Sequence, residues 1–326
     1  LCVGFLVNSG SEANELAVRL ARAFTGMQDM AVVDGAYHGH TGMLIELSPY
    51  KFKGPGGKGS PEPWVHVLPI PDSYRREGKD FFREADSVIG NSGGVAGLLI
   101  ETMLSCAGQV PLPKGYLEAV SEAVRKEGGL LIADEVQVGF GRVGSSMWAF
   151  DDSEVTPDIV VMGKPMGNGH PMGAVFTTKE VASAFGEMEF FSTFGGNPVS
   201  CAIGSAVLDV IEQEKLMEGA SSLGKRLMDG LNSLMDSHQI VGDVRGRGLF
   251  LGIELVRDRA TKEPADIEAA FLVDMMREKG VLLSTDGPLH NVIKIKPPMV
   301  LTAYDVDDAL QKLDETLANC GKQFRP

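Results

Sequence analysis

The stretch Gly129-Leu-Leu-Ile-Ala-Asp134 is an apolar run that ends in a carboxylate. Two further short runs, residues 95–100 and Ile159–Met162, are followed by Glu101 and by Gly163-Lys164. None of the three alternates strictly, which is typical of strands buried on both faces of a parallel sheet. Ligands bind outside the carboxyl ends of such strands. If the strands are neighbours, about 4.8 Å apart, we expect Glu101, Asp134 and Lys164 to border one small pocket.

Helical patterns separate these runs. Residues 12–24 place Leu16, Ala17, Leu20, Ala21 and Phe24 on one face, and a second helix is predicted over residues 115–126. Met30–Val33 is a fourth strand candidate. This βαβ-like order predicts an α/β fold with a mostly parallel sheet covered by helices.

The pattern changes after Pro198. Helices are predicted over residues 199–211, 216–237, 267–279 and 305–318, and strands over residues 241–244, 249–256, 281–283 and 292–296. This is typical of a smaller α+β unit. We therefore expect a large domain over residues 1–215 and a small C-terminal domain over residues 216–326.

Charge and composition exclude several functions. The net charge of −14 opposes binding to nucleic acid. No apolar run approaches the ~20 residues of a membrane helix. The four cysteines form no CxxC pair, and no third ligand stands near His38 and His40, so we predict no metal site and a cytoplasmic protein with reduced thiols. Because Leu1 is not a start methionine, we expect a missing N-terminal region, which leaves an organelle address open.

Two motifs carry the chemistry. Asn8-Ser-Gly-Ser-Glu-Ala-Asn14 has capping-box spacing between Ser9 and Glu12, and its free N–H groups are also suited to hold a phosphate. Glycines flank Lys164 within Met162-Gly-Lys-Pro-Met-Gly-Asn-Gly-His-Pro171 and leave room for a flat ring. Taken alone, these features are equally consistent with a helix cap and a structural Asp-Lys pair. Together they fit pyridoxal 5'-phosphate (PLP), which needs a phosphate anchor, an acid at its ring nitrogen and an amine at its aldehyde.

A family resemblance rests on these motifs. Asn8-Ser-Gly-Ser-Glu-Ala-Asn14, Asp134-Glu-Val-Gln-Val-Gly-Phe-Gly-Arg142 and Gly163-Lys164 resemble the signature set of class III aminotransferases over essentially the whole chain. The resemblance implies the fold type I architecture of PLP enzymes. It also implies a homodimer whose active sites lie at the subunit interface and which binds a small-molecule amine.

The resemblance implies roles around the cofactor ring. Lys164 carries PLP as a Schiff base and later acts as the base, while Asp134 pairs with the pyridine nitrogen. Val136 packs on one face of the ring, Tyr37 covers the other, and Gln137 lies near the ring hydroxyl. Val136 and Tyr37 are also compatible with simple core positions.

The remaining roles concern the phosphate and the surroundings of the ring. Gly10 and Ser11 hold the phosphate of PLP, and Thr193 resembles a phosphate ligand that the other subunit supplies. Glu101 is expected near the cofactor without direct contact.

The reaction is indicated by a departure from the family pattern. Many members have an Arg three residues before a Pro-Pro pair to bind a substrate carboxylate, but the residue before Pro297-Pro298 at this spacing is Lys294. Lys lacks the planar fork that binds a carboxylate through two hydrogen bonds. Arg75, Lys294 and Lys296 are candidates for binding a substrate phosphate, or are solvated surface charges. His170 is a candidate for the site or for a structural role.

Further segments resemble one branch of the class, the amine phospho-lyases. They are Leu47-Ser-Pro-Tyr-Lys51, to which spacing assigns no role, Pro71-Asp-Ser-Tyr-Arg75, residues 162–171 and Ser284-Thr-Asp-Gly-Pro288. The resemblance predicts a PLP-dependent lyase that releases phosphate and ammonia from O-phosphoethanolamine or a phosphorylated hydroxy-amine. The alternatives are an ω-amino-acid or alanine–glyoxylate type aminotransferase, and an inactive PLP-binding fragment.

Overall fold

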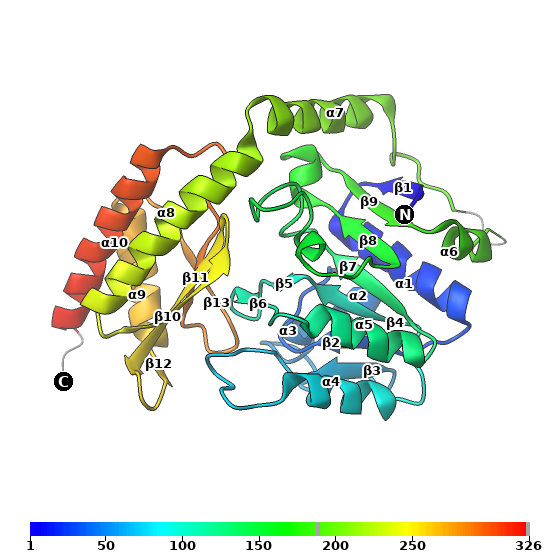
Figure 1. The fold of residues 1–326 in the computed structure, drawn as a ribbon, viewed down its shortest axis with the longest axis horizontal. Helices are drawn as coiled ribbons and strands as arrows, with labels where there is room; N and C mark the ends of the chain where they lie inside the picture. The colour runs from blue at the N-terminus through cyan, green and yellow to red at the C-terminus, as the bar shows by residue number, and fades with distance from the viewer. Residues whose placement is uncertain (187–189, 324–326) are drawn as a thin grey trace.

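The computed structural model describes residues 1–186 and 190–323, and it contains two principal sheets (Figure 1). The larger sheet has the strand order β1-β9-β8-β7-β4-β2-β3. β9 runs antiparallel to both neighbours, and the other neighbouring strands are parallel. The strands are β1 (Val3–Val7), β2 (Met30–Val33), β3 (Val65–Leu68), β4 (Gly97–Glu101), β7 (Leu130–Asp134), β8 (Ile159–Met162) and β9 (Gly173–Thr177). The predicted mostly parallel α/β sheet is confirmed.

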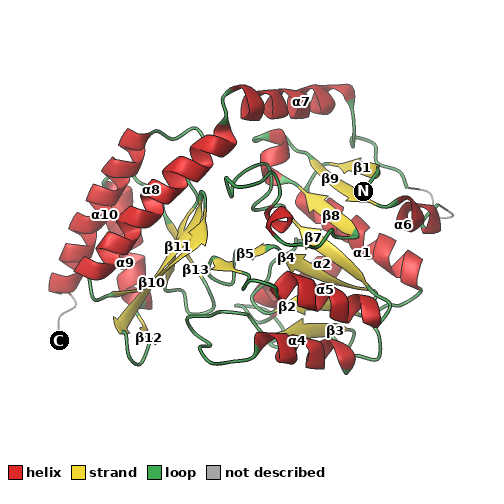
Figure 2. Cartoon of the chain, in the orientation of Figure 1, coloured by secondary structure: helices red, strands yellow, loops and turns green. Residues whose placement is uncertain are grey.

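Helices cover both faces of this sheet (Figure 2). Alternate side chains of β7 reach opposite faces, as the period of two in a strand requires. Leu131 and Ala133 join the core formed with α4 (Phe81–Gly90) and α5 (Tyr116–Lys126), whereas Leu130 and Ile132 pack with α1 (Gly10–Thr25). Burial on both faces explains why these strands read as continuous apolar runs.

Short elements lie around the large sheet. They are α2 (Gly42–Glu46), α3 (Pro49–Phe52), α6 (Lys179–Ala184), the hairpin β5 (Met103–Leu104) and β6 (Val110–Pro111), and the 3₁₀ turns η1 (Ala149–Asp152) and η2 (Lys164–Gly167).

The C-terminal part forms a second, antiparallel sheet in the order β10-β11-β14-β13, with β12 paired to β11. Its helices pack on one face, and the other face is turned toward the large sheet (Figure 1). The elements are α8 (Leu216–Ser237), β10 (Val241–Arg247), β11 (Phe250–Asp258), β12 (Glu263–Pro264), α9 (Asp266–Glu278), β13 (Ser284–Asp286), β14 (Val292–Ile295) and α10 (Ala303–Gln323).

The connection between the two units is α7 (Pro198–Gln213), which leads into α8. Lys215 lies between these helices with a positive φ of 51°, and we propose this break as the domain boundary. Residues 324–326 of the predicted C-terminal domain lie outside the described residues.

Some expected elements differ in the structure. Residues 281–283 are not a strand, because the ladder with β14 begins only at Ser284, which pairs with Lys294. β3 and β9 are strands that the apolar pattern did not predict. Phe24 is 42% exposed, since it lies in the last turn of α1 just before Gly26 ends that helix.

Two features are absent from the described residues. No helix there combines the length and apolar character needed to cross a membrane. In the same residues, no group of three or more His, Cys, Asp and Glu side chains has an arrangement that could hold a metal ion.

Candidate active site

Three neighbouring strands bring the predicted residues together. β7 lies between β4 and β8, and Glu101 is the register partner of Asp134, which in turn pairs with Val161. Lys164 follows three residues after Val161. The two carboxylates and the amine therefore meet at the carboxyl edge of the parallel sheet, where such sheets bind ligands.

Asp134 is a buried carboxylate with several protein donors. Its Oδ2 accepts hydrogen bonds from Asn14 Nδ2 and lies 2.8 Å from His38 Nδ1, and its Oδ1 accepts one from the Val136 N–H. A carboxylate has about four lone-pair positions. One position on Oδ1 therefore remains for a protonated ring nitrogen, so the bonding of Asp134 fits the acid partner that PLP requires.

Glu101 is buried beside Asp134 and binds backbone amides. Its two oxygens accept hydrogen bonds from the N–H groups of Tyr37 at 3.1 Å and Ser105 at 2.9 Å. Burial raises the pKa of Glu101, and the nearby Asp134 adds to this rise. Glu101 thus fixes the backbone of Tyr37.

Lys164 begins the turn η2 directly after β8. Its φ of 27° is unusual for a residue other than glycine and costs about 1–3 kcal/mol, which surrounding structure must offset. The side chain is exposed in this chain, and no hydrogen bond or ion pair holds its amine within the described residues. The amine is therefore available to a ligand.

The start of α1 forms the candidate phosphate site. Ser9 Oγ accepts a hydrogen bond from Glu12 N–H, and a Glu12 carboxylate oxygen accepts one from Asn8 N–H, so the predicted cap exists. Ser11 Oγ accepts a hydrogen bond from the His40 N–H. The N–H groups of the first turn and the helix dipole are suited to an anion at this end.

Gly10 of the candidate phosphate site lies close to Gly163, the residue before Lys164, and both glycines lie close to Val136. A Cβ added to Gly163 would lie 3.2 Å from Gly10 Cα and 3.3 Å from Val136 Cγ1. A Cβ on Gly10 would lie 3.1 Å from the same Val136 methyl group. Only glycine at these two positions leaves this junction its present shape.

Tyr37 and Gln137 lie at the border of the same region. Tyr37 is half-buried and packs edge-on against Tyr50, with ring centroids 6.1 Å apart. Gln137 Oε1 accepts a long, 3.4 Å hydrogen bond from Lys296 Nζ.

Thr193 does not join these residues within one chain. It is exposed between α6 and α7, and no hydrogen bond connects it to the site described above. The nearby Gly195 packs on Leu6 of the edge strand β1.

The comparisons with known proteins decide the family. The model of the aminotransferase class III family matches residues 3–317. The chain belongs to the class III aminotransferases. Enzymes of this class are PLP-dependent, and the donors around Asp134, the open amine of Lys164 and the glycine junction at Gly10 and Gly163 fit that cofactor.

Relatives in this class carry two kinds of name. The chain is 49% identical to "Alanine--glyoxylate aminotransferase 2-like" of Drosophila melanogaster, covering 97% of this chain and 68% of the relative. It is 43% identical to "Ethanolamine-phosphate phospho-lyase homolog 1" of Caenorhabditis elegans, covering 95% and 72%. Among solved structures, an Arthrobacter phospholyase in complex with phosphoethanolamine matches with a TM-score of 0.91 and 43% identity, covering 97% of this chain and 77% of that one.

Asn14 and His38 are residues of this class III site that the motifs did not predict. The signal for Asn14 was a polar side chain on the buried face of α1. His38 directly follows Tyr37, but its sequence context suggests only a metal ligand. Both contact Asp134, and His38 Nε2 remains buried without a protein partner.

Two further candidates have other partners. Arg75 Nε binds Glu254, and Arg75 Nη1 donates to the Lys262 carbonyl, so this guanidinium joins the two domains. His170 Nε2 lies 2.8 Å from Ser200 Oγ at the start of α7. Neither side chain is available to the site in this structure.

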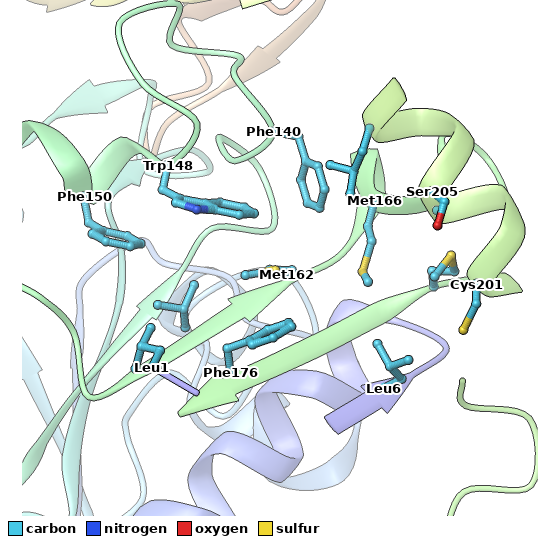
Figure 3. A pocket seen from close by; sticks show the side chains of 14 residues that line it. Leu1, Leu6, Phe140, Trp148, Phe150, Met162, Met166, Phe176, Cys201 and Ser205 are labelled. Carbon is cyan, nitrogen blue, oxygen red and sulfur yellow. The ribbon is translucent and has the colours of Figure 1, made fainter. Parts of the chain in front are cut away.

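A pocket of about 480 Å³ lies elsewhere in the large domain (Figure 3). Apolar side chains such as Phe140, Trp148, Met162 and Phe176 line it, and its lining side chains include no carboxylate, lysine or imidazole. Cys201 is the one titratable side chain among them.

Proposed function

We propose that this class III enzyme is an amine phospho-lyase, which converts O-phosphoethanolamine or a related phosphorylated amine and water into phosphate, ammonia and an aldehyde. The proposal rests on the side chain at position 294 of β14, which borders the site. This residue is a lysine, and Lys294 Nζ lies 3.0 Å from Asp286 Oδ2. The site thus has single ammonium groups here and no guanidinium fork for a carboxylate.

Lys296 is the second cation near the site. Its Nζ donates to Ser105 Oγ at 2.6 Å and lies 4.4 Å from the centroid of the Phe250 ring. Burial lowers the pKa of Lys296 from 10.5 to about 8, with the neighbouring Lys294 as the next cause. A phosphate group would relieve the repulsion between these two ammonium groups and form charge-assisted hydrogen bonds with them.

Two arginines of the domain junction, Arg142 and Arg75, already have protein partners. Arg142 Nη1 donates to the carbonyls of Leu249 and Pro297, and Arg75 binds Glu254. These partners favour a substrate without a carboxylate.

The proposed roles follow from this geometry. When bound, PLP supplies the electron sink for the electrons of a broken C–H bond. Asp134 keeps the ring nitrogen protonated, and Lys164 takes the proton from the amine-bearing carbon. The C–O bond at the adjacent carbon then breaks as a C=C bond forms, and phosphate leaves with the C–O electron pair next to Lys294 and Lys296. Water hydrolyses the released enamine to ammonia and the aldehyde.

The remaining residues position the cofactor. We propose that Gly10 and Ser11 hold its phosphate, that Val136 and Tyr37 enclose its ring, and that Gln137 lies near its hydroxyl. Glu101 fixes Tyr37 from behind through the backbone hydrogen bond described above.

We also propose a homodimer in which Thr193 reaches the partner's site. Exposed apolar side chains around Thr193 and along α7 support this, because patches of this kind typically mark interfaces. They include Phe191, Phe194, Val199, Leu208 and Val210, with exposed fractions of 76, 70, 65, 45 and 41%. Light scattering after size exclusion should give twice the chain mass; a single chain mass would contradict the proposal.

A second candidate function is an aminotransferase, because several relatives carry that name. A human relative, "Alanine--glyoxylate aminotransferase 2, mitochondrial", is 40% identical over 95% of this chain and 66% of its own length. The name also leaves a mitochondrial location open beside the cytoplasmic one that we predict.

The test measures phosphate release from O-phosphoethanolamine by the purified, PLP-loaded protein without a keto acid. We expect continuous release, and we expect none with Lys164→Ala, which should also lose the visible absorption of lysine-bound PLP. No release, together with amino transfer from an amine donor to glyoxylate or pyruvate, would favour the aminotransferase. Absence of both activities despite bound PLP would favour an inactive chain.

A further inference from the structure

The segment around α3 is fastened to the backbone on both sides of Tyr37. Ser48 Oγ accepts a hydrogen bond from the His38 N–H at 2.9 Å, and the Tyr50 N–H donates to the Ala36 carbonyl at 3.1 Å. These two hydrogen bonds hold α3 against the backbone beside Tyr37. The sequence motif over residues 47–51 has no assigned role in the reaction described above.

Lys51 projects from this unit over two aromatic rings. Its Nζ lies 5.8 Å from the centroid of the Tyr37 ring and 5.3 Å from that of Tyr50, within the range of cation–π attraction. The side chain is exposed, and among the described residues no carboxylate forms an ion pair with it. The chain has a net charge of −14, so carboxylates outnumber cationic side chains in it. Lys51 has aromatic rings as its neighbours instead, and its ammonium group can therefore attract an anion from outside the chain.

Lys53 shows the ordinary alternative two residues away. Its Nζ lies 2.7 Å from Asp34 Oδ2, and both side chains are partly exposed. Lys53 is therefore neutralised by the protein, whereas Lys51 is not.

The position of Lys51 relates it to the other cations of the site. The Glu101 carboxylate accepts hydrogen bonds from the N–H groups of Tyr37 and Ser105, and Ser105 Oγ accepts one from Lys296 Nζ at 2.6 Å. Repulsion from the neighbouring Lys294 contributes to the lowered pKa of Lys296. Tyr37 and the two lysines of the small domain thus border one region, and Lys51 lies at its Tyr37 side.

We propose that Lys51 is a specificity-determining residue that binds the phosphate group of a phosphorylated amine substrate, an assignment that rests on the proposed function. An ammonium group offers three hydrogen-bond donors, and bonds to phosphate are charge-assisted. The rings of Tyr37 and Tyr50 hold the ammonium group in place and leave its charge available. Lys51 then recognises the end of the substrate that a simple amine lacks.

The experiment compares Lys51→Met, Lys51→Arg and the control Lys53→Met with the parent chain, all loaded with PLP. Methionine retains the contact with the rings and removes the charge. The affinity for inorganic phosphate is measured by calorimetry, with the cofactor's own phosphate site filled. KM and kcat are measured with O-phosphoethanolamine, and PLP absorbance and the melting temperature verify the fold.

We expect Lys51→Met to weaken phosphate binding and raise KM by about tenfold to a hundredfold, the range for a hydrogen bond to a charged group. Its kcat should change much less, because the lost interaction serves binding rather than the chemical step. Lys51→Arg should retain most of the affinity, and Lys53→Met should match the parent chain.

Unchanged phosphate affinity in Lys51→Met would overturn the assignment, as would an equal loss in Lys53→Met. Failure of the lyase reaction is distinguishable, because phosphate binding is measured without turnover. If the parent chain binds phosphate through Lys51 but releases none from phosphorylated amines, the phosphate site stands and the lyase reaction is wrong.

Discussion

Among single residues, the negative charge of Asp134 matters most for the proposed reaction. Asp134→Asn keeps the size of the side chain but removes the charge beside the ring nitrogen, and its single amide oxygen can accept from Asn14 Nδ2 or from the Val136 N–H but not from both. We expect kcat/KM for phosphate release to fall by about 10²–10³-fold, the typical cost of removing one preorganised electrostatic group. PLP content is measured in parallel; a variant with bound PLP and near-parent activity would contradict this role.

Lys296 gives a prediction for pH dependence. Its pKa is about 8 in the folded chain, and only the protonated form binds phosphate well. We therefore expect kcat/KM for O-phosphoethanolamine to fall as the pH rises through about 8. Lys296→Arg should move this limb to higher pH, since guanidinium stays charged. An identical profile in the two proteins would exclude Lys296 as its cause.

The same shift affects folding stability with a defined sign. Between pH about 8 and 10.5 the unfolded chain binds this proton more tightly than the folded chain does. Stability therefore rises with pH across that window. The lowered pKa thus reflects a cost of burial that the site carries below pH 8.

Among the elements, the close contact between the start of α1 and the end of β8 borders the proposed position of the PLP ring. In Gly163→Ala, the new Cβ would lie 3.2 Å from Gly10 and would force the two backbones apart. Overpacking of this kind costs about 1–3 kcal/mol, and we expect PLP affinity to fall accordingly, by about fivefold to 150-fold. Titration of the cofactor-free protein with PLP measures this, with Gly219→Ala, whose surroundings are open and whose φ is not positive, as a control for added bulk.

Much of the fold at this scale was predictable, and the reasons are local. β2 and β8 match their predicted limits because both are short apolar runs buried on both faces. β3 was not predicted, because His66 interrupts its apolar pattern. In the structure His66 Nε2 lies 2.9 Å from Asp29 Oδ2, so this polar residue has a partner beside the strand. β13 begins three residues later than expected, where pairing with β14 rather than hydrophobicity decides the limit.

Site residues were predictable where the neighbouring sequence itself indicates a strand end or a helix start. Asp134 and Lys164 are marked by the strands before them. The contacts of Asn14 and His38 with Asp134 join residues separated by 120 and 96 positions, and no local pattern records such pairing. The partners of Arg75 and Lys296 likewise come from the other domain.

At the scale of the whole molecule, a buried charge network joins the two domains. Glu254 binds Arg75 of the large domain and lies 2.7 Å from Arg245 Nη1, and Arg245 Nε donates to the Gly108 carbonyl. We expect Glu254→Gln to lower the free energy of unfolding by about 1.5–3 kcal/mol, the range for hydrogen bonds to charged groups, because Arg75 loses its carboxylate partner while Arg245 keeps Asp243. Urea denaturation measures the loss, and Asp229→Asn, from the exposed pair with Lys225, should change stability by less than about 1 kcal/mol.

The central claim is that elimination, and not amino transfer, occurs at Lys164. The most direct test follows the nitrogen of O-phosphoethanolamine in PLP-loaded protein without a keto acid, counting ammonia and phosphate per active site over many turnovers. We expect both products to form in equal amounts, well beyond one equivalent per site, with the cofactor absorbance restored at the end. Consumption of no more than one equivalent of nitrogen per site, which remains on the cofactor and is released only when a keto acid is added, would contradict elimination.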